Sequence, residues 1–408
     1  MDPEEARAHV FAVFVIPKQV TTMSSCKFKG VAMEYRFFPK MPGLKISTIG
    51  FGCMRLPVLD HDLARIDEEL ATRLLHEALD AGVNYVDTAW PYHGGQSEPF
   101  VGRALKGGRR EKVQLATKLP VWLVEAEGDW ERFIDDQLKK LDTGRIDFYL
   151  MHSIDGERWQ TICSLKGMQA MERAKADGRI GHIGFSFHGS PDDFKKIIDG
   201  FDWEFCQVQF NFLDERFQAG LEGMKYATGR NIGVIVMEPI RGGALAKVPP
   251  AVQSIWDRSG RGWLPAEWAL RWVLHHPEPV TVLTGMNAES QVRENVRIAS
   301  APEALSARDL EFVEEVKAFF KAKIRVPCTT CGYCLPCPNG VSIPNVLSLY
   351  NDAAMFESKA GPAYVYRNFF GDAGADLCIE CGECEPKCPQ NIEITAKLKE
   401  AHKVMSDE

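Results

Sequence analysis

The amino-acid sequence predicts an α/β protein: a closed (β/α)8 barrel followed by a small, mostly helical C-terminal domain. Three observations support this prediction. Eight β-rich runs alternate with helical patterns between residues 45 and 300, polar residues end most of these runs, and eight of the 12 cysteines crowd into two clusters after residue 325. The length of 408 residues fits one large domain and one small one.

The β-rich runs cover residues 45–52, 83–89, 113–119, 146–152, 180–187, 205–212, 232–239 and 280–286. Amphipathic stretches separate them, and two of these stretches, EELATRLLHEALDAG and LKGMQAMERAKADG, end in glycine, as helix C termini often do. Alternating units imply a parallel sheet with right-handed crossovers, and eight units imply closure into a barrel. An open nucleotide-binding sheet would need a G-x-G-x-x-G turn after its first strand, and GFGCMR is a poor match.

Polar residues stand at the ends of six of the eight predicted strands. They are Asp87, Lys118, His152, Ser186, Gln207 and Glu238. Each could simply cap the following helix, but active sites of such barrels lie at the C-terminal ends of the strands. A common site is therefore the better interpretation.

The chain is expected to divide into an N-terminal extension (residues 1–32), the barrel (33–324) and the C-terminal domain (325–408). Residues 10–16 are apolar but few, and they follow an acidic start, which argues against a signal peptide. The extension is expected to be disordered or an over-long gene start; docking on the barrel or on a partner is the alternative. The boundary near residue 325 follows a helical pattern over residues 304–323.

Composition narrows the function classes. A net charge of -8 gives no general attraction to nucleic acid or acidic membranes. The sequence contains no run of about 18 apolar residues, so no transmembrane helix is expected. Clustered cysteines in an intracellular chain indicate metal ligation rather than disulfides, so a cytoplasmic protein is expected.

Four strand-end residues resemble the catalytic tetrad of the aldo-keto reductases. Asp87 is followed five residues on by Tyr92 in DTAWPY, Lys118 ends the third run in LATKL, and His152 ends the fourth in YLMHS. The resemblance extends from about residue 43 to 300 with the strand order intact. It implies a TIM-barrel oxidoreductase that reduces the carbonyl group of a small molecule.

The chemistry of carbonyl reduction explains these residue types. The reaction needs a proton on oxygen, and Tyr92 can donate it if the Lys118 ammonium lowers its pKa from the usual value of about 10. Asp87 would hold Lys118 charged, and His152 would orient the carbonyl group. A structural Asp87–Lys118 ion pair beside a pocket-lining tyrosine is the alternative.

The same resemblance implies a nicotinamide cofactor, NAD(P)H. Its expected contacts are Met54, Arg55, Ser186, Gln207, Met237, Pro239, Arg241, Gly242, Gly285, Gln291, Glu294 and Asn295. Gln207 keeps one amide contact of the family, and Glu294 with Asn295 keeps the pair that contacts adenine.

The sequence also departs from the family pattern on the cofactor side. Phe187 follows Ser186 where an asparagine is usual, and Met237 stands where a tyrosine often stacks on the nicotinamide. Gly285, Met286 and Gln291 replace the cationic residues that bind a 2′-phosphate, a role for which Arg and Lys are suited. Arg241 could reach a phosphate instead, although the glycines after it also fit a flexible surface loop. These departures put NADP preference in doubt and leave a flavin open as the alternative cofactor.

The C-terminal cysteines predict two [4Fe-4S] clusters. Cys378, Cys381, Cys384 and Cys388, followed by proline, form C-x2-C-x2-C-x3-C-P, the signature of bacterial ferredoxins. Cys328, Cys331, Cys334 and Cys337 form a similar motif whose last gap is two residues instead of three.

In such paired motifs the fourth cysteine typically ligates the other cluster, so Cys388 is expected to join the first cluster and Cys337 the second. Structural zinc is the alternative, but zinc sites usually combine separated C-x2-C pairs, whereas here three cysteines twice fall within seven residues. The helical spacer between the motifs resembles the α-helical ferredoxin domains of multi-subunit redox enzymes.

The two halves move electrons differently, because a nicotinamide transfers two as a hydride and an iron–sulfur cluster transfers one. The primary interpretation is a carbonyl-reducing oxidoreductase with clusters for electron transfer. The alternative is a flavin-dependent or ferredoxin-linked electron-transfer protein or subunit, with a ferredoxin-like partner and the barrel as scaffold. The intact tetrad speaks against a degenerate barrel, and the altered nicotinamide contacts favour a flavin.

Overall fold

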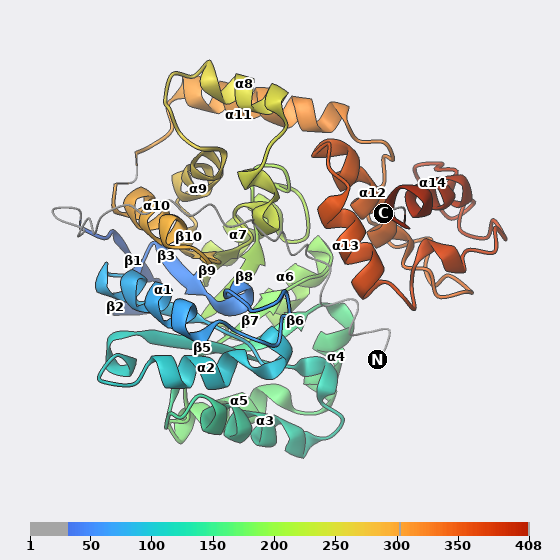
Figure 1. Cartoon of the computed structure of the whole chain (residues 1–408). Coiled ribbons are helices and arrows are strands. Elements are labelled where there is room, and N and C mark those ends of the chain that lie inside the picture. The colour runs from blue at the N-terminus through green and yellow to red at the C-terminus, as the bar shows by residue number, and fades with distance from the viewer. Residues whose placement is uncertain (1–31, 302, 407–408) are drawn as a thin grey trace. The chain divides into compact units, whose positions relative to one another are not determined.

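A computed structural model describes residues 32–301 and 303–406, and it confirms the predicted barrel. Eight parallel strands close in the order β10-β3-β4-β5-β6-β7-β8-β9 (Figure 1). They are β3 (Ile49–Gly52), β4 (Tyr85–Asp87), β5 (Gln114–Leu119), β6 (Ile146–Ile154), β7 (Ile180–Phe187), β8 (Phe205–Gln209), β9 (Gly233–Met237) and β10 (Pro279–Thr284). All eight belong to one compact unit, formed by the described residues of 22–239 and 267–305.

The helices between the strands follow the predicted alternation. They are α1 (Glu68–Asp80), α2 (Ser97–Ala104), α3 (Glu127–Lys140), α4 (Gly156–Ser164), α5 (Gly167–Ala176), α6 (Pro191–Gly200), α7 (Gly220–Thr228), α9 (Pro265–His275) and α10 (Glu289–Ser300). Helix α1 shows why they form: the Asp67 side chain accepts a hydrogen bond from the Leu70 amide at its start, and an apolar stripe is buried. Gly82 then adopts a positive φ just beyond its end, as the glycine signal predicts.

The first predicted strand differs from the observed one. Residues 45–52 divide, because Met41–Ser47 (β2) pairs antiparallel with Tyr35–Phe38 (β1), and only β3 enters the barrel. The β1–β2 hairpin inserts Phe38 among the side chains that fill the barrel, next to Phe148 and Phe205, with ring centroids 5.2 and 6.0 Å away. A Cβ on Gly233 would lie 2.0 Å from the Phe38 ring, so only glycine fits beside it.

Replacing Phe38 by Ala is expected to reduce the free energy of unfolding by about 3–5 kcal/mol, because a fully buried ring would leave a cavity. Phe37→Ala is the matched control, since the neighbouring ring is 47% exposed and its loss should cost no more than about 0.5 kcal/mol. Denaturant unfolding followed by far-UV circular dichroism measures both. Equal losses in the two variants would show that the hairpin does not close the barrel core.

The second compact unit combines residues 240–266 with residues 306–406. Its helices are α8 (Pro250–Asp257), α11 (Ala307–Ala322), α12 (Ile343–Met355), α13 (Ala360–Phe369) and α14 (Ile394–Ser406). Ser306 and Asp309 form a capping box at the start of α11, within the helix predicted at 304–323. Helices α12, α13 and α14 pack around a shared apolar core against which the cysteine motifs also lie.

No helix in the described part of the chain is both long and apolar enough to span a bilayer. The predicted N-terminal extension lies almost wholly outside the described residues, and the predicted boundary near residue 325 stays a prediction.

Candidate functional site

Three barrel strands and one short helix bring the four tetrad residues together. Asp87 ends β4, Lys118 lies in β5 and His152 in β6, while Tyr92 begins a 3-10 helix, Tyr92–Gly95. Parallel pairing sets Asp87 beside Ala116, two residues before Lys118. The carboxyl ends of adjacent parallel strands therefore converge on one site.

The Lys118 ammonium is the centre of this site. Its Nζ donates to Asp87 Oδ1 at 2.5 Å, to the Thr88 carbonyl oxygen at 2.8 Å and to the Tyr92 hydroxyl oxygen at 3.2 Å. Lys118 is fully buried, and burial favours its neutral form. The charge of Asp87 and the contact with Tyr92 outweigh burial and raise the pKa of Lys118, so it remains an ammonium ion.

The Tyr92 phenol stays protonated at neutral pH. Burial raises its pKa above the usual value, while the charge of Lys118 acts in the opposite direction. Sequence reasoning anticipated the influence of Lys118 but not that burial would exceed it. A protonated phenol held 3.2 Å from an ammonium group is a proton donor whose conjugate base would be stabilised as it forms.

Aromatic rings surround the tetrad. The His152 ring centroid lies 6.1 Å from that of Tyr92 and 5.1 Å from that of Trp122. Trp122 lies in the 3-10 helix Val121–Leu123, which follows strand β5. Apolar walls of this kind strengthen the electrostatic effect of the Lys118 charge, because they exclude water.

A buried polar network fixes the backbone behind Lys118. Gln137 Nε2 of α3 donates to the Lys118 carbonyl oxygen at 3.0 Å and also to a carboxylate oxygen of Glu98. Thr117 donates to the same Glu98 oxygen at 2.7 Å, and Tyr149 donates to Gln137 Oε1 at 2.6 Å. These hydrogen bonds hold strand β5 and hence the position of the ammonium group.

Ser186, Gln207 and Met237 lie in three adjacent strands, β7, β8 and β9. Ser186 pairs in register with Gln207, and its hydroxyl oxygen accepts from the Ser153 amide at 2.7 Å. Gln207 is buried; its Nε2 contacts Met237 Sδ at 3.5 Å, and its Oε1 has no hydrogen-bond partner among the described residues. Pro239, also a predicted contact, is buried just beyond β9. A buried amide oxygen without a partner suits a ligand that brings a donor, such as a carboxamide.

The ends of β3 and β10 carry a second group of predicted contacts. Arg55 ends the 3-10 helix Cys53–Arg55, and a Cβ on Gly285 would lie 3.2 Å from the Arg55 Cβ. Met54 beside it is 36% exposed. At the start of α10, Gln291 Oε1 accepts a hydrogen bond from the Asn287 backbone N–H at 2.8 Å. The Gln291 side chain thus holds the loop that precedes the helix. Glu294 and Asn295, one turn further along α10, are half-buried.

Arg241 and Gly242 belong to the other compact unit, which begins at residue 240. Arg241 Nη1 donates to Asp352 Oδ1 of α12 at 2.8 Å, and its guanidinium carbon lies 5.7 Å from the centroid of the Phe356 ring. The segment Arg241–Ala246 forms 3-10 turns interrupted by a kink at Gly242 and Gly243, which take positive φ angles. The phosphate-binding role expected of Arg241 therefore competes with an ion pair inside its own unit.

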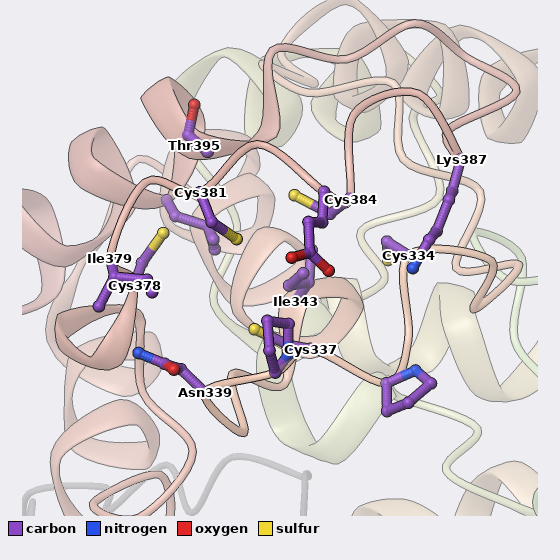
Figure 2. A pocket seen from close by; sticks show the side chains of 14 residues that line it. Cys334, Cys337, Asn339, Ile343, Cys378, Ile379, Cys381, Cys384, Lys387 and Thr395 are labelled. Carbon is purple, nitrogen blue, oxygen red and sulfur yellow. The ribbon is translucent and has the colours of Figure 1, made fainter.

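Three cysteines of the second motif line a cavity together with Cys337. Cys378, Cys381 and Cys384 line it, as does Cys334 of the first motif. The sulfur atoms of Cys337, Cys378, Cys381 and Cys384 face a common space (Figure 2). Thiolates converging from two distant segments onto one space form a donor set that fits an iron–sulfur cluster.

The remaining cysteines form a second neighbourhood. Burial raises the pKa of the Cys328 thiol, and Cys331 and Cys388 are the thiols whose charges act on it. The Cys388 thiol of the second motif therefore acts on the first motif, as the Cys384 thiol does through Cys334. Which cysteines share a cluster stays a prediction.

Sequence reasoning missed two charged or titratable residues near the tetrad. Arg158 Nη1 donates to the Ser153 carbonyl oxygen at 2.6 Å, and its guanidinium carbon lies 5.5 Å from the Trp122 ring centroid. Burial and the neighbouring charges of Arg158 and Lys118 lower the pKa of His188 to about 4, so its ring is neutral at pH 7. His188 directly follows β7, and the strand-end signal that located Ser186 could have found it. Arg158 lies inside α4, where no strand-end signal applies.

Comparison with known families supports both halves of the architecture. Residues 48–318 match the model of the aldo/keto reductase family, and residues 327–393 match that of a 4Fe-4S dicluster domain. Among curated proteins, an uncharacterised oxidoreductase, YqkF, of Bacillus subtilis is 27% identical over 63% of this chain and 89% of its own length. L-galactose dehydrogenase of Arabidopsis thaliana is 28% identical over 68% of this chain and 92% of its own length.

A solved structure gives the same result for the barrel. The holo form of the aldo-keto reductase AKR11C1 from Bacillus halodurans aligns with a TM-score of 0.58 and 28% identity. The alignment covers 69% of this chain and 96% of that one.

Proposed function

Because the chain belongs to the aldo/keto reductase family, we propose that this oxidoreductase reduces the carbonyl group of a small molecule with NAD(P)H, and that its 4Fe-4S clusters transfer electrons. The observation that carries the proposal is the position of the buried Lys118 ammonium, 2.5 Å from Asp87 and 3.2 Å from the Tyr92 hydroxyl. If the Asp87–Lys118 ion pair served only stability, it would not require the protonated Tyr92 hydroxyl beside the ammonium group.

Each tetrad residue has a distinct role in the proposed reaction. When bound, the nicotinamide supplies a hydride to the carbonyl carbon. Tyr92 donates a proton to the carbonyl oxygen, and Lys118 stabilises the phenolate that results. Asp87 keeps Lys118 charged, and the His152 ring orients the carbonyl group.

The nicotinamide is favoured as cofactor by the buried Gln207. Its partnerless Oε1 can accept a hydrogen bond from the NH2 group of a carboxamide, and Ser186 stands beside it in register. Met237 offers an apolar surface next to this amide. A flavin presents no primary carboxamide from its redox-active ring, so these contacts fit the nicotinamide better.

For the C-terminal unit we propose two clusters with exchanged fourth ligands. Cys328, Cys331, Cys334 and Cys388 would hold one cluster, and Cys337, Cys378, Cys381 and Cys384 the other. The cavity lined by Cys337 and the second motif supports this assignment. The exposed positions of Cys331 and Cys381 suit electron exchange with a redox partner such as a ferredoxin-like protein.

Anaerobic purification followed by cofactor analysis tests this function. Two clusters predict about eight iron and eight sulfide per chain, with a broad visible absorbance and no flavin released on denaturation. Addition of aldehydes to the purified enzyme should then cause oxidation of NADPH or NADH. Stoichiometric flavin, or reduction that proceeds only with an added ferredoxin-like donor and never with NAD(P)H, would favour the electron-transfer alternative.

A further inference from the structure

Arg55 has two guanidinium nitrogens that are buried and unpartnered. Its Nε and Nη2 atoms are shielded from solvent and have no hydrogen-bond partner among the described residues. By contrast, Arg158 of the same unit donates to the backbone and side chain of Ser153. Buried N–H groups without a hydrogen-bond partner are unfavourable, so this half-buried side chain is suited to binding an anion.

An anion that binds Arg55 would lie at the end of the barrel that carries the tetrad. Arg55 follows β3, and its aliphatic stem lies against Gly285 at the end of β10. Its positive charge also acts on the Tyr92 phenol. Arg55 follows β3 and Tyr92 follows β4, so both residues stand at the carboxyl ends of neighbouring strands, where the substrate of such a barrel binds.

Among the charged groups that act on the Tyr92 phenol, Lys118 and Arg55 are positive and Asp87 is negative. Lys118 and Arg55 both act on Tyr92, and Arg158 and Lys118 both act on His188. Asp87 offsets one of these charges and is already bonded to Lys118. An electropositive cleft with apolar walls attracts and retains anions.

We propose that Arg55 binds a carboxylate carried by the carbonyl substrate, so that the barrel selects oxo or aldehyde acids over neutral carbonyl compounds. This inference rests on the proposed carbonyl reduction and adds the substrate class. A phosphate of the cofactor offers the same oxyanion chemistry, but in a nicotinamide dinucleotide a ribose separates the phosphates from the reactive ring. The position of Arg55 at the end of β3, beside the strand that carries Asp87, therefore favours the substrate.

The test uses the intact holoenzyme, purified anaerobically and saturated with NADP+ so that no turnover occurs. Calorimetry measures the Kd of benzaldehyde and of 2-, 3- and 4-carboxybenzaldehyde, which carry the carboxylate at three distances from the carbonyl carbon. At least one acid should bind about tenfold or more tightly than benzaldehyde, as expected for a charge-assisted bidentate contact.

Arg55→Met keeps the apolar stem and removes the charge. It should weaken binding of the preferred acid about 10- to 100-fold and change benzaldehyde binding less than about twofold. Arg55→Lys should recover only part of the affinity, because it loses the planar fork. Arg65→Met, which removes an exposed arginine paired with Asp60, controls for net charge and should change nothing.

Three results would overturn the proposal: no preference for any acid in the wild-type enzyme, equal losses for acid and benzaldehyde, or a loss confined to NADPH affinity measured by fluorescence titration. The last result would assign Arg55 to a cofactor phosphate. Tight binding of an acid through Arg55 by a wild-type enzyme that never turns over with NAD(P)H would count against carbonyl reduction, and not against Arg55.

Discussion

Replacing Tyr92 by Phe is expected to lower kcat for carbonyl reduction by about 10²–10⁴-fold, the usual contribution of a positioned general acid. The ring remains in place, so packing against His152 and the contact of Lys118 with the ring, 4.8 Å from its centroid, are retained. Only the proton that passes to the carbonyl oxygen is lost. Steady-state kinetics with an aldehyde and NAD(P)H measure the change, and iron content and circular dichroism confirm that the protein is otherwise intact.

The pH dependence gives an independent check on the same residue. Burial raises the pKa of Tyr92 above its usual value of about 10, so the acid form predominates below that value. The rate of reduction should therefore show no loss from Tyr92 ionisation at neutral or mildly alkaline pH, and fall only as the pH rises through the raised pKa. Turnover by Tyr92→Phe at the wild-type rate would refute the assignment.

The second large effect is expected in the C-terminal unit. Cys388→Ala should abolish the cluster of the first motif, although Cys388 lies in the second motif by sequence. The structural basis is the proximity of Cys388 to Cys328, together with the place of Cys337 beside Cys378. Iron should fall from about eight to about four per chain, because the remaining cluster keeps all four of its thiolates.

Cys337→Ala should give the same iron content by losing the other cluster, so the two variants differ in which electron paramagnetic resonance signal survives. Cys163→Ala is the control, since this exposed thiol belongs to neither motif. Because the cysteines pack against the core of α12, α13 and α14, loss of either cluster should also destabilise that unit. The same surviving signal in both variants would contradict exchanged ligation.

The sequence predicted the fold because the signals it used are local. Strand and helix periodicity, and residues at strand ends, arise from segments of about ten residues, and eight alternating units leave few topologies other than a barrel. The same locality made Asp87, Tyr92, Lys118 and His152 recognisable: each follows or ends a strand, and parallel strands bring such ends together.

The first strand was placed less accurately for a related reason. Residues 45–52 have one continuous β pattern, and nothing in that pattern shows that β2 pairs with β1 while β3 enters the barrel. The burial of Phe38 and the exposure of Phe37 decide which side of the hairpin faces the core. That choice depends on side chains from strands more than 100 residues away, such as Phe148 and Phe205.

By itself, the sequence determined the order of elements, the family of the barrel and the iron–sulfur character of the cysteine motifs. Tertiary structure decided how charges are paired: Arg241 pairs with Asp352 and Lys118 with Asp87, while Nε and Nη2 of Arg55 find no partner among the described residues. It also decided that burial outweighs Lys118 in setting the pKa of Tyr92. The physical reason is that electrostatic and desolvation energies depend on distances and burial among segments far apart in the chain, which no local pattern records.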